Sequence, residues 1–478
     1  MPKLPPSPRS PAFVQTLRFY RDPFRLLQEC QERFGDIFMI KLLGLGNWVF
    51  LTSPDLMKQM FKSSDALVCG EVNGKSLGFI MGLDAVFSLD GKPHLARRKI
   101  VLPYFTGKAV KKRIGMMHEV GRRGIEEWTP GETFPFLRYA HLTSLRVMVN
   151  TFFEASPQEV QDQMIEAFDI FSMKGLRSPL IPLSFLQVDF GPLSPWRKLL
   201  NLRDAVGELV AQEVDRRIAD PGRFGDRDVA SSLVGAMTRG EIEVTRQGLI
   251  DEIFNDIFAG HETTGGVLTW AVECVIRRPE LLGRLRQEID QVLGDGPVTT
   301  ENIAKLPVTD AIIAESVRYR PLAPQAGFRL LKKEYEVGGY QLPEGTILAH
   351  GFSALARNPE VFENPEQFDL DHFHENKVKH FDWSPFGGGT RMCLGKGLAE
   401  IELAVLLPLV FQLMDLELMQ KEVYPVRHGM FFGPNEGLMV KATPRTPVSL
   451  DASQETSSSP IEGDDSQGGG AARCPVAH

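Results

Sequence analysis

A glycine-rich segment with one cysteine, directly ahead of a long apolar stretch, constrains this chain more than any other feature. The segment runs from Phe386 to Gly395 and holds Cys393, and the apolar stretch from 397 to 407 has helical spacing. The positive N-terminal end of such a helix stabilises a thiolate, and the glycines let backbone N–H groups approach the sulfur. The segment therefore predicts a haem-iron thiolate at Cys393, with Phe386, Arg391 and Gly395 beside the haem. A buried free cysteine in a loop before a core helix is the alternative.

The composition is that of a globular protein without a strong attraction to nucleic acid. Hydrophobic residues make up 43% of the 478 residues, charged residues make up 24%, and the net charge is −8. Because no long block of lysine or arginine can neutralise phosphates, we expect no nucleic acid partner. The five cysteines are scattered and odd in number, which favours a reducing, cytoplasmic location over a disulfide framework.

The two ends of the chain differ from its body. Residues 1–8 are proline-rich and contain no apolar run, so we expect neither a signal peptide nor a membrane anchor. From residue 444 onward, Ser, Thr, Pro, Asp and Gly dominate, which predicts a disordered, low-complexity tail over 444–478. The remaining residues, 1–443, are expected to form a single large domain, and we expect the protein to be a monomer.

Helical spacing dominates residues 1–443, with strands predicted near 37–51, 335–337 and 346–350. The longest predicted helix, from about 245 to 277, contains the residues 259–264 in the order Ala-Gly-His-Glu-Thr-Thr. A threonine in mid-helix can donate a hydrogen bond to the carbonyl four residues earlier and loosen the helix. Thr263, Glu262 and Gly260 are therefore candidates for a local opening that admits O2 and passes protons. A helix interior with small polar residues is the alternative.

A second predicted helix, from about 308 to 319, carries Glu315 and Arg318. Residues three positions apart lie on one helical face, so this carboxylate and guanidinium can pair and hold another segment. Such a pair is a weak indicator by itself, because most are solvated surface contacts. Its position in the chain, after the Thr263 helix and before Cys393, gives it more weight.

Together these motifs resemble those of the cytochrome P450 family of haem-thiolate monooxygenases. Residues 386–395 fit the family pattern Phe-x-x-Gly-x-Arg-x-Cys-x-Gly, and Glu262-Thr263 resembles the acid–threonine pair of its oxygen-activation motif. The resemblance implies the cytochrome P450 fold, mainly α with a small β region, in a single large haem domain. It also implies haem b as the cofactor and O2 as a co-substrate. Since no N-terminal anchor is expected, the chain is similar to soluble, bacterial-type members.

The resemblance implies further haem contacts and one departure from the family pattern. His94 and Arg98 resemble the family's His-x-x-x-Arg pair, and Arg329 resembles a further propionate contact. The family usually completes the Glu-x-x-Arg pair with an arginine from a later loop, where this chain has His372. We expect His372 to bond to Glu315, as a cation if it is buried. Whether it replaces the arginine functionally stays open.

The implied activity is insertion of one oxygen atom of O2 into a C–H bond, with electrons from a separate redox partner. The sequence has no flavin or iron–sulfur motif, and basic residues gather between 97 and 123, which predicts docking of a ferredoxin or flavodoxin served by a reductase. A solvated helix surface is the alternative explanation of those charges. A peroxide-using haem-thiolate peroxygenase and a non-catalytic haem-thiolate ligand-binding protein are the alternative functions, and the Glu262–Thr263 pair counts against both.

The substrate is expected to be lipophilic, either a fatty acid or a terpenoid or steroid-like molecule. Long apolar and aromatic residues occur where the family's distal pocket would lie, and pockets are lined mainly by such side chains. General similarity to soluble bacterial members that hydroxylate fatty acids and terpenes favours the same class, by analogy. The candidate substrate contacts are Phe79, Phe171, Phe254, Phe258 and Phe431.

Overall fold

The computed structural model describes residues 4–62, 67–176, 189, 191, 194–373, 378 and 382–445. Up to Pro444 the chain forms one compact unit. The tail predicted over 444–478 lies outside the described residues except for its first two positions. Among the described residues, no helix is both long enough and apolar enough to span a membrane.

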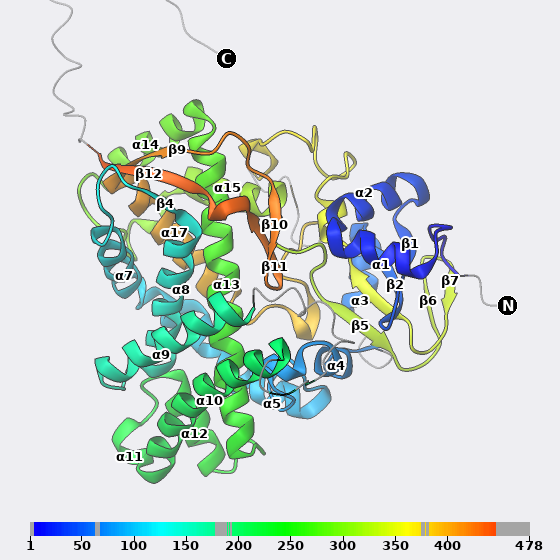
Figure 1. Cartoon of the computed structure of the whole chain (residues 1–478), viewed down its shortest axis with the longest axis horizontal. Helices are drawn as coiled ribbons and strands as arrows, with labels where there is room; N and C mark the ends of the chain where they lie inside the picture. Colours follow the sequence, from blue (N-terminus) through cyan, green and yellow to red (C-terminus); the bar gives the residue numbers. More distant parts are fainter. Residues whose placement is uncertain are drawn as a thin grey trace, which may run out of the picture. The chain divides into compact units, whose positions relative to one another are not determined.

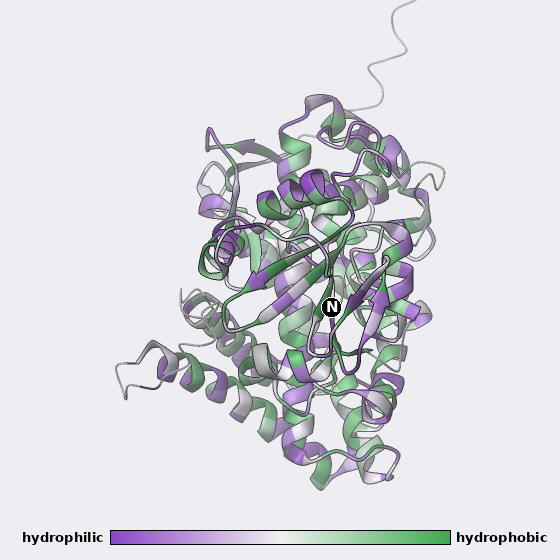
Figure 2. Ribbon diagram, turned by 90° about the vertical axis from the view of Figure 1, so that its right-hand side faces the viewer, coloured by the Kyte–Doolittle hydropathy of each residue, from purple (hydrophilic) through white to green (hydrophobic). Residues whose placement is uncertain are grey.

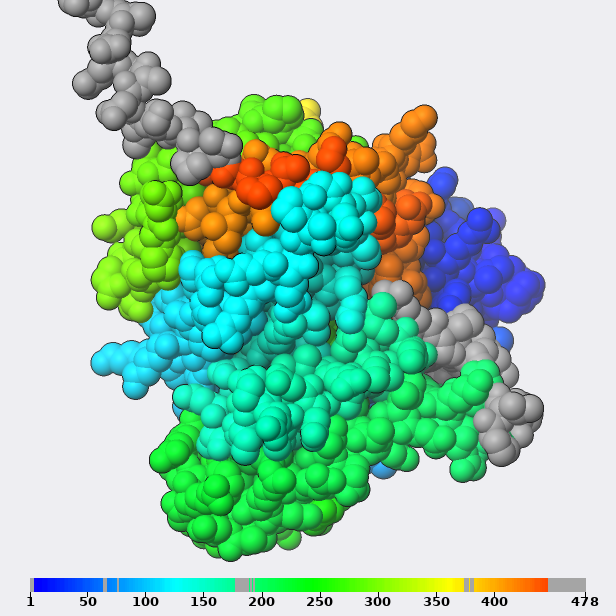
Figure 3. Space-filling view, turned by 60° about the vertical axis from the view of Figure 1, so that its left-hand side comes forward, coloured from blue at the N-terminus to red at the C-terminus, as the bar shows by residue number. Residues whose placement is uncertain are grey.

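Helices make up most of the unit, and most of them gather on one side of it (Figure 1). They are α1 (Ala12–Arg21), α2 (Pro23–Phe34), α3 (Pro54–Lys62), α4 (Gly70–Met81), α5 (Gly91–Val101), α6 (Gly107–Lys111), α7 (Ile114–Glu126), α8 (Phe136–Phe153), α9 (Gln158–Ile170), α10 (Pro195–Ala219), α11 (Pro221–Phe224), α12 (Val229–Thr238), α13 (Arg246–Ile276), α14 (Pro279–Val292), α15 (Pro307–Tyr319), α16 (Phe352–Leu355) and α17 (Lys396–Leu413). Figure 3 shows the face on which the cyan to green segments, from α7 to α12, lie side by side.

The strands form small sheets, and the largest lies opposite the main group of helices. The strands are β1 (Ile37–Leu42), β2 (Gly46–Leu51), β3 (Leu67–Val68), β4 (Thr133–Pro135), β5 (Phe328–Leu331), β6 (Tyr335–Val337), β7 (Tyr340–Leu342), β8 (Ile347–His350), β9 (Met414–Leu418), β10 (Pro425–His428), β11 (Phe431–Pro434) and β12 (Met439–Pro444). The largest sheet has the order β1-β2-β8-β5-β3, and β2 and β8 run parallel. Helices α1, α2 and α3 lie beside this sheet (Figure 1). Figure 2 views the molecule from the side of this sheet.

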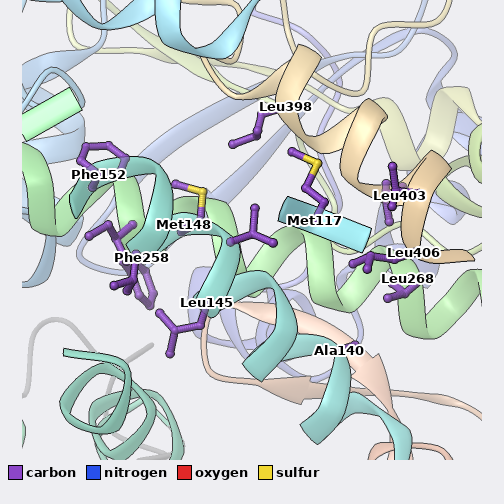
Figure 4. Packing of buried hydrophobic residues seen from close by; sticks show 14 of the residues in the cluster. Met117, Ala140, Leu145, Met148, Phe152, Phe258, Leu268, Leu398, Leu403 and Leu406 are labelled. Carbon is purple, nitrogen blue, oxygen red and sulfur yellow. The ribbon is translucent and has the colours of Figure 1, made fainter. Parts of the chain in front are cut away.

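The central helix of the fold is α13, which is buried along most of its length. The Thr245 hydroxyl caps its N-terminus by accepting a hydrogen bond from the Gly248 N–H at 2.9 Å. Helix α8 packs closely along α13. The missing side chain at Gly260 permits this approach, since a Cβ atom there would lie 2.5 Å from the Met148 sulfur. The apolar residues between α13, α8 and α17 form the largest core of the protein (Figure 4).

Most of the predicted elements occur where the sequence places them. The mainly α architecture with small sheets is confirmed, and the hairpin near 37–51 is the β1–β2 pair. The long helix predicted over 245–277 is α13, and the helix predicted over 308–319 is α15. Strand β8 pairs in parallel with β2 across about 300 residues of chain, and no local pattern indicates such a partner.

Candidate active site

The Cys393 thiol lies in a loop whose backbone is held on both sides of it. The Cys393 N–H donates to the Phe386 carbonyl at 2.9 Å, and α17 begins three residues after the cysteine. Desolvation raises the pKa of the thiol, while hydrogen bonds from the Gly395 and Lys396 N–H groups and the charge of Arg98 act against that rise. Of the four cysteines among the described residues, Cys393 is the exposed one. This loop therefore presents a single sulfur atom to an open space.

Two glycines explain how the loop and α17 approach their neighbours. Gly389 has φ +66°, and a Cβ atom there would lie 2.5 Å from the Phe61 carbonyl oxygen. At Gly397 a Cβ atom would lie 2.7 Å from the Phe105 carbonyl oxygen. The N-terminus of α17 can therefore sit directly against the segment that follows α5.

A narrow exposed strip interrupts the buried helix α13. Ala259 is exposed, while Gly260, Thr263 and Val267 are partly exposed, and the residues 251–258 before them are buried. Positions 259, 263 and 267 are four apart and so share one helical face. Asp256, one turn earlier on the same helix, acts electrostatically on the Cys393 thiol, so this part of α13 lies near the cysteine loop.

The predicted loosening of the helix at Thr263 has the expected geometry. The Thr263 hydroxyl donates to the Ala259 carbonyl at 2.8 Å. Gly260 has a role that the sequence does not reveal, because a side chain there would collide with Met148 of α8. The exposed strip is thus lined by a hydroxyl group and small residues.

Glu262 lies beside Thr263 and faces a polar cluster between α13 and α8. Burial alone would raise its pKa, but the charges of His141 and His261 and hydrogen bonds from His261 and Ser172 lower it to about 2. The carboxylate Oε1 lies 3.4 Å from His261 Nε2. Glu262 is therefore an anion stabilised by hydrogen bonds from His261 and Ser172 and by the charge of His141.

The four predicted propionate contacts come together in the structure. His94 is buried, and desolvation together with the charges of Arg391 and Arg98 lowers its pKa to about 4. Desolvation and the charge of Arg391 also lower the pKa values of Arg98 and Arg329. Asp90 pairs with Arg391, which also donates to the carbonyl oxygens of residues 86 and 89. Three buried or half-buried arginines beside a buried histidine, with Asp90 paired to Arg391, suit a ligand with two carboxylates.

The pair of Glu315 and Arg318 is buried, and every donor of the arginine is used. Arg318 Nε and Nη2 donate to the two Glu315 oxygens at 2.7 and 2.5 Å. Its remaining three N–H groups donate to the carbonyl oxygens of Ala356, Pro365 and Gln367 at 2.6 to 2.9 Å. Five donors meet five acceptors, so the guanidinium fixes the segment that leads toward Cys393.

His372 lies where the sequence predicts it, against Glu315. Its Nδ1 is 3.1 Å from Glu315 Oε1, and its Nε2 is 2.6 Å from the Glu363 carbonyl oxygen. Both partners are acceptors, so the ring makes both bonds only when each nitrogen carries a proton. The Asp369 N–H also donates to Glu315 Oε1, at 2.8 Å. The loop thus donates two hydrogen bonds to one buried carboxylate oxygen.

The structure separates the predicted substrate contacts into two groups. Phe79 is partly buried and lies 4.5 Å, centroid to centroid, from Trp196, while Phe431 is partly buried in β11. Phe171, Phe254 and Phe258 are fully buried and pack on one another with centroid distances of 5.3 to 6.4 Å. In the structure those three rings belong to an aromatic core, so their predicted contact with a substrate stays a prediction.

Three polar residues of the site carry no recognisable sequence signal. Asp90 receives the Cys69 and Gly70 N–H groups as well as Arg391, so it connects α4 to the cation group. Ser172 and His141 lie in apolar helical segments and meet Glu262 only through packing. The place of Asp90 directly before the predicted helix with His94 and Arg98 is a weak sequence indication of a role at that helix start. For Ser172 and His141 the sequence gives no indication of contact with Glu262.

The site combines the Cys393 thiol in its glycine loop, the Thr263 turn of α13 and the group of arginines at 98, 329 and 391. This is the arrangement of a haem-thiolate protein. A family model described as cytochrome P450 matches residues 4–442. The chain therefore belongs to the cytochrome P450 family, whose members bind haem b through a cysteine thiolate.

Relatives with this family name occur in mycobacteria. The chain is 30% identical over 416 residues to cytochrome P450 138 of Mycobacterium tuberculosis, covering 87% of this chain and 90% of the relative. It is 28% identical over 427 residues to cytochrome P450 135B1 of the same organism, covering 86% and 85%. These names state a family and a number, and no substrate.

Solved structures of the same fold are also similar. A retinoic acid-bound structure of cyanobacterial CYP120A1 superposes with a TM-score of 0.81 at 22% identity, covering 93% of this chain and all of the other. The haem domain of cytochrome P450DA gives a TM-score of 0.79 at 21% identity, covering 94% and 99%. At these identities the comparison establishes the fold, a single cytochrome P450 haem domain.

Proposed function

We propose that this protein uses O2 to insert one oxygen atom into a C–H bond of a lipophilic substrate, with Cys393 as the haem ligand. The family supports a haem monooxygenase in general. The observation that carries the assignment is that the exposed Cys393 thiol lies near a part of the buried helix α13 where Ala259 is exposed and Thr263 is partly exposed. When bound, the haem supplies a redox-active iron on which O2 is reduced, and the thiolate donates electron density to it.

The cation group would hold the two haem propionates. His94, Arg98, Arg329 and Arg391 carry or can carry positive charge in a confined space, so each propionate would find a donor. A Cβ atom at Gly395 would meet only the Cys393 sulfur, at 4.0 Å, so this glycine leaves room for the macrocycle beside the cysteine loop. The buried Glu315, Arg318 and His372 hold the backbone of residues 356–369, in the segment that leads toward the loop.

Thr263 and Glu262 would manage protons at the distal face. The Thr263 hydroxyl lies on the exposed strip, so it can donate a hydrogen bond to bound oxygen after rotating away from the Ala259 carbonyl. Glu262, the preceding residue, is an anion that accepts hydrogen bonds from His261 and Ser172, and we propose that it receives and releases a proton only transiently. The small residues at 259 and 260 leave space for oxygen and water.

A lipophilic substrate is supported by the partly exposed aromatic residues of the distal side. Phe79 and Phe431 retain exposed surface, and an apolar ligand would cover it. The structurally similar CYP120A1 binds retinoic acid, an isoprenoid carboxylic acid, so the fold accommodates an extended lipophilic ligand. We therefore propose a terpenoid or steroid-like molecule or a long-chain fatty acid as the substrate class.

Electrons would come from a ferredoxin or flavodoxin that docks near α6. Lys108, Lys111 and Lys112 are exposed, and α6 packs against α17, the helix that follows Cys393. Arg97 and Arg113, which the sequence assigned to the same basic cluster, are buried, and Arg97 pairs with Glu252. A smaller lysine patch thus supports the docking proposal. The four described cysteines are free, which fits the proposed cytoplasmic location.

Spectral titration of the purified, haem-loaded protein tests the proposed function. A panel of retinoids, other terpenoids, steroids and fatty acids should contain members that shift the haem spin state at micromolar concentration. Those members should be hydroxylated when NADPH, O2 and a surrogate ferredoxin and its reductase are supplied. Product formation with hydrogen peroxide but none with NADPH, O2 and the electron donors would favour the peroxygenase alternative, and tight binding restricted to small, charged metabolites would contradict the substrate class.

A further inference from the structure

Glu262 belongs to a polar cluster that the acid–threonine motif does not describe. His261 is buried at 1% exposure between the rings of Phe168 and Phe258. Its Nε2 lies 3.0 Å from the Ser172 hydroxyl and 3.4 Å from Glu262 Oε1. Ser172 also hydrogen-bonds to Glu262. One imidazole nitrogen, one hydroxyl and one carboxylate therefore meet within hydrogen-bonding or ion-pair distance.

The hydrogen bonds of His261 restrict where the ring can gain or lose a proton. Its Nδ1 lies 3.0 Å from the Ile257 carbonyl oxygen, which can only accept, so Nδ1 carries a hydrogen in both charge states. Protonation and deprotonation consequently occur at Nε2. In the neutral ring Nε2 accepts a hydrogen bond from Ser172, and in the cation Nε2 donates toward Glu262. Since the Ser172 hydroxyl can rotate, both states keep their hydrogen bonds.

The position of Ser172 depends on a break in helical geometry. Helix α9 ends at Ile170 and continues as one π-helical turn, η2 (Phe171–Gly175). Widened turns of this kind occur often at functional sites because they redirect side chains. Phe171 is the first residue of the turn and anchors it in the aromatic core, while Ser172 faces His261. The packing of the Phe171 ring on Phe254 thus supports the polar contact between Ser172 and His261.

A small cavity lies on the other side of Glu262 and leads toward a surface histidine. Its volume is about 10 Å³, and its lining includes Glu262, Ser172, His141, His428 and Gly429. This is close to the minimum space that one ordered water occupies, and the side chains of Glu262, Ser172, His141 and His428 contribute polar groups beside the apolar Met173 and Leu176. His141 and His428 are partly exposed. A Cβ atom at Gly265 would lie 2.6 Å from the His141 ring, so that glycine holds His141 against α13.

We propose that His261 and Ser172 form a proton switch that stores and reorients the proton for Glu262, and that the His141–His428 cavity refills it. This inference rests on the proposed monooxygenase function and identifies its relay residues. The groups facing Glu262 are His261 on α13, His141 on α8, Ser172 on η2 and His428 on β10.

Each transfer conserves charge. Protonated His261 passes the Nε2 proton to Glu262, which leaves a neutral ring and a neutral carboxylic acid. The Ser172 hydroxyl then rotates and donates to the vacant Nε2. Glu262 releases its proton toward the Thr263 hydroxyl and becomes an anion again. A proton from solvent, carried through the cavity past His428 and His141, restores the starting state.

The first experiment does not depend on turnover. NMR spectra of protein labelled at histidine carbon ε1, in the haem-loaded, reduced CO complex, report each ring as the pH is changed. The His261→Gln variant assigns the His261 signal by its disappearance. Glu262→Gln should move the His261 titration midpoint to lower pH, and Ser172→Ala should move it in the opposite direction. A midpoint that moves in neither variant would overturn the switch.

The second experiment measures how NADPH oxidation is coupled to product formation between about pH 6 and 9. This range includes the neutral region in which histidine side chains commonly change charge. His261→Gln and Ser172→Ala should lower coupling roughly tenfold, release peroxide, and change the pH profile and solvent isotope effect. Ser172→Thr, which keeps a hydroxyl, should restore most of the coupling. His118→Gln on α7 is the matched control and should behave like the native protein.

The two experiments fail in different ways. Native-like coupling and pH profile in both His261→Gln and Ser172→Ala would overturn the proposed relay while leaving the monooxygenase function intact. If the native protein forms no product with O2, the proposed function fails, and the NMR titration still decides whether His261, Ser172 and Glu262 are linked. Product formation driven by added peroxide should persist in both variants, because peroxide already brings the protons.

Discussion

The two sides of the Cys393 site differ in how their hydrogen bonds are arranged. On the cysteine side, the five Arg318 donors meet five acceptors and His372 bridges two acceptors, so no group there has an alternative partner. On the Thr263 side, the Ser172 hydroxyl and His261 Nε2 can exchange donor and acceptor roles. One side is suited to holding a ligand in a fixed position, and the other is suited to moving protons.

The largest expected effect comes from removing the sulfur on the fixed side. The reduced CO complex of the native protein should show the long-wavelength Soret band of thiolate-ligated haem. Cys393→His should abolish that band, since imidazole does not donate electron density as a thiolate does. Cys30→Ala, which changes a buried cysteine in α2, is the control and should keep it. A normal band in Cys393→His would remove the basis for the proposed haem ligand.

Breaking the hydrogen-bond set of Arg318 should be nearly as severe. Glu315→Ala or Arg318→Ala leaves a buried charge unpaired, at a cost of about 3–5 kcal/mol, so haem should be lost. Haem content per protein after purification and the urea midpoint measure this effect. His372→Arg should keep the haem because arginine can donate to both acceptors. Full haem retention in both alanine variants would show that the fixed side does not need this pair.

On the proton-moving side, a single change should alter chemistry while leaving the fold unchanged. Thr263→Ala removes the hydroxyl from the exposed strip and keeps the helix. Haem and substrate binding should remain, while reducing equivalents appear as peroxide in place of product. Thr269→Ala is a matched control, because that hydroxyl makes the same bond to the carbonyl four residues earlier but is buried. Equal coupling in the two variants would contradict a role for Thr263.

The smallest expected effect concerns an exception to the charge pairing on the cysteine side. Glu402 of α17 is buried, and desolvation raises its pKa from 4.5 to about 8 despite a hydrogen bond from Ser144. The folded protein therefore keeps this proton up to about pH 8, whereas the unfolded chain releases it near pH 4.5. Stability consequently falls as the pH rises between these two values.

Replacing that carboxyl group should remove the pH-dependent loss. At pH 8, Glu402→Gln should unfold at higher temperature than the native protein, by a free energy of a few kcal/mol at most. At pH 4 the two proteins should unfold at similar temperatures. Glu400→Gln, on the exposed face of the same helix, should show no such difference between the two pH values. Parallel pH curves for native protein and Glu402→Gln would contradict the raised pKa.

Sequence reasoning predicts the fixed side better than the proton-moving side. The fixed side is visible in the sequence as motifs of set spacing, because each motif lies within one short segment of the chain. These motifs contain Cys393, Glu315 and Arg318, and the departure at His372 is visible in the same way. Ser172 meets His261 only because a π-helical turn redirects it, and the sequence has no marker for that turn. The rings of Phe254 and Phe258 show a limit of another kind, since apolar periodicity indicates burial without saying whether protein or ligand covers the side chain.

The crowded positive charges of Arg98, Arg329 and Arg391 have a consequence for the order of events in the cell. Before haem binds, these three guanidinium groups repel one another in a poorly hydrated space. Asp90 forms an ion pair with Arg391 and offsets part of this repulsion. Newly synthesised chains should therefore close this region fully only when the cofactor brings its carboxylates. Under iron or haem starvation, the protein should accumulate in a protease-sensitive form that opens around α5 and the cysteine loop, so haem supply would control its abundance as well as its activity.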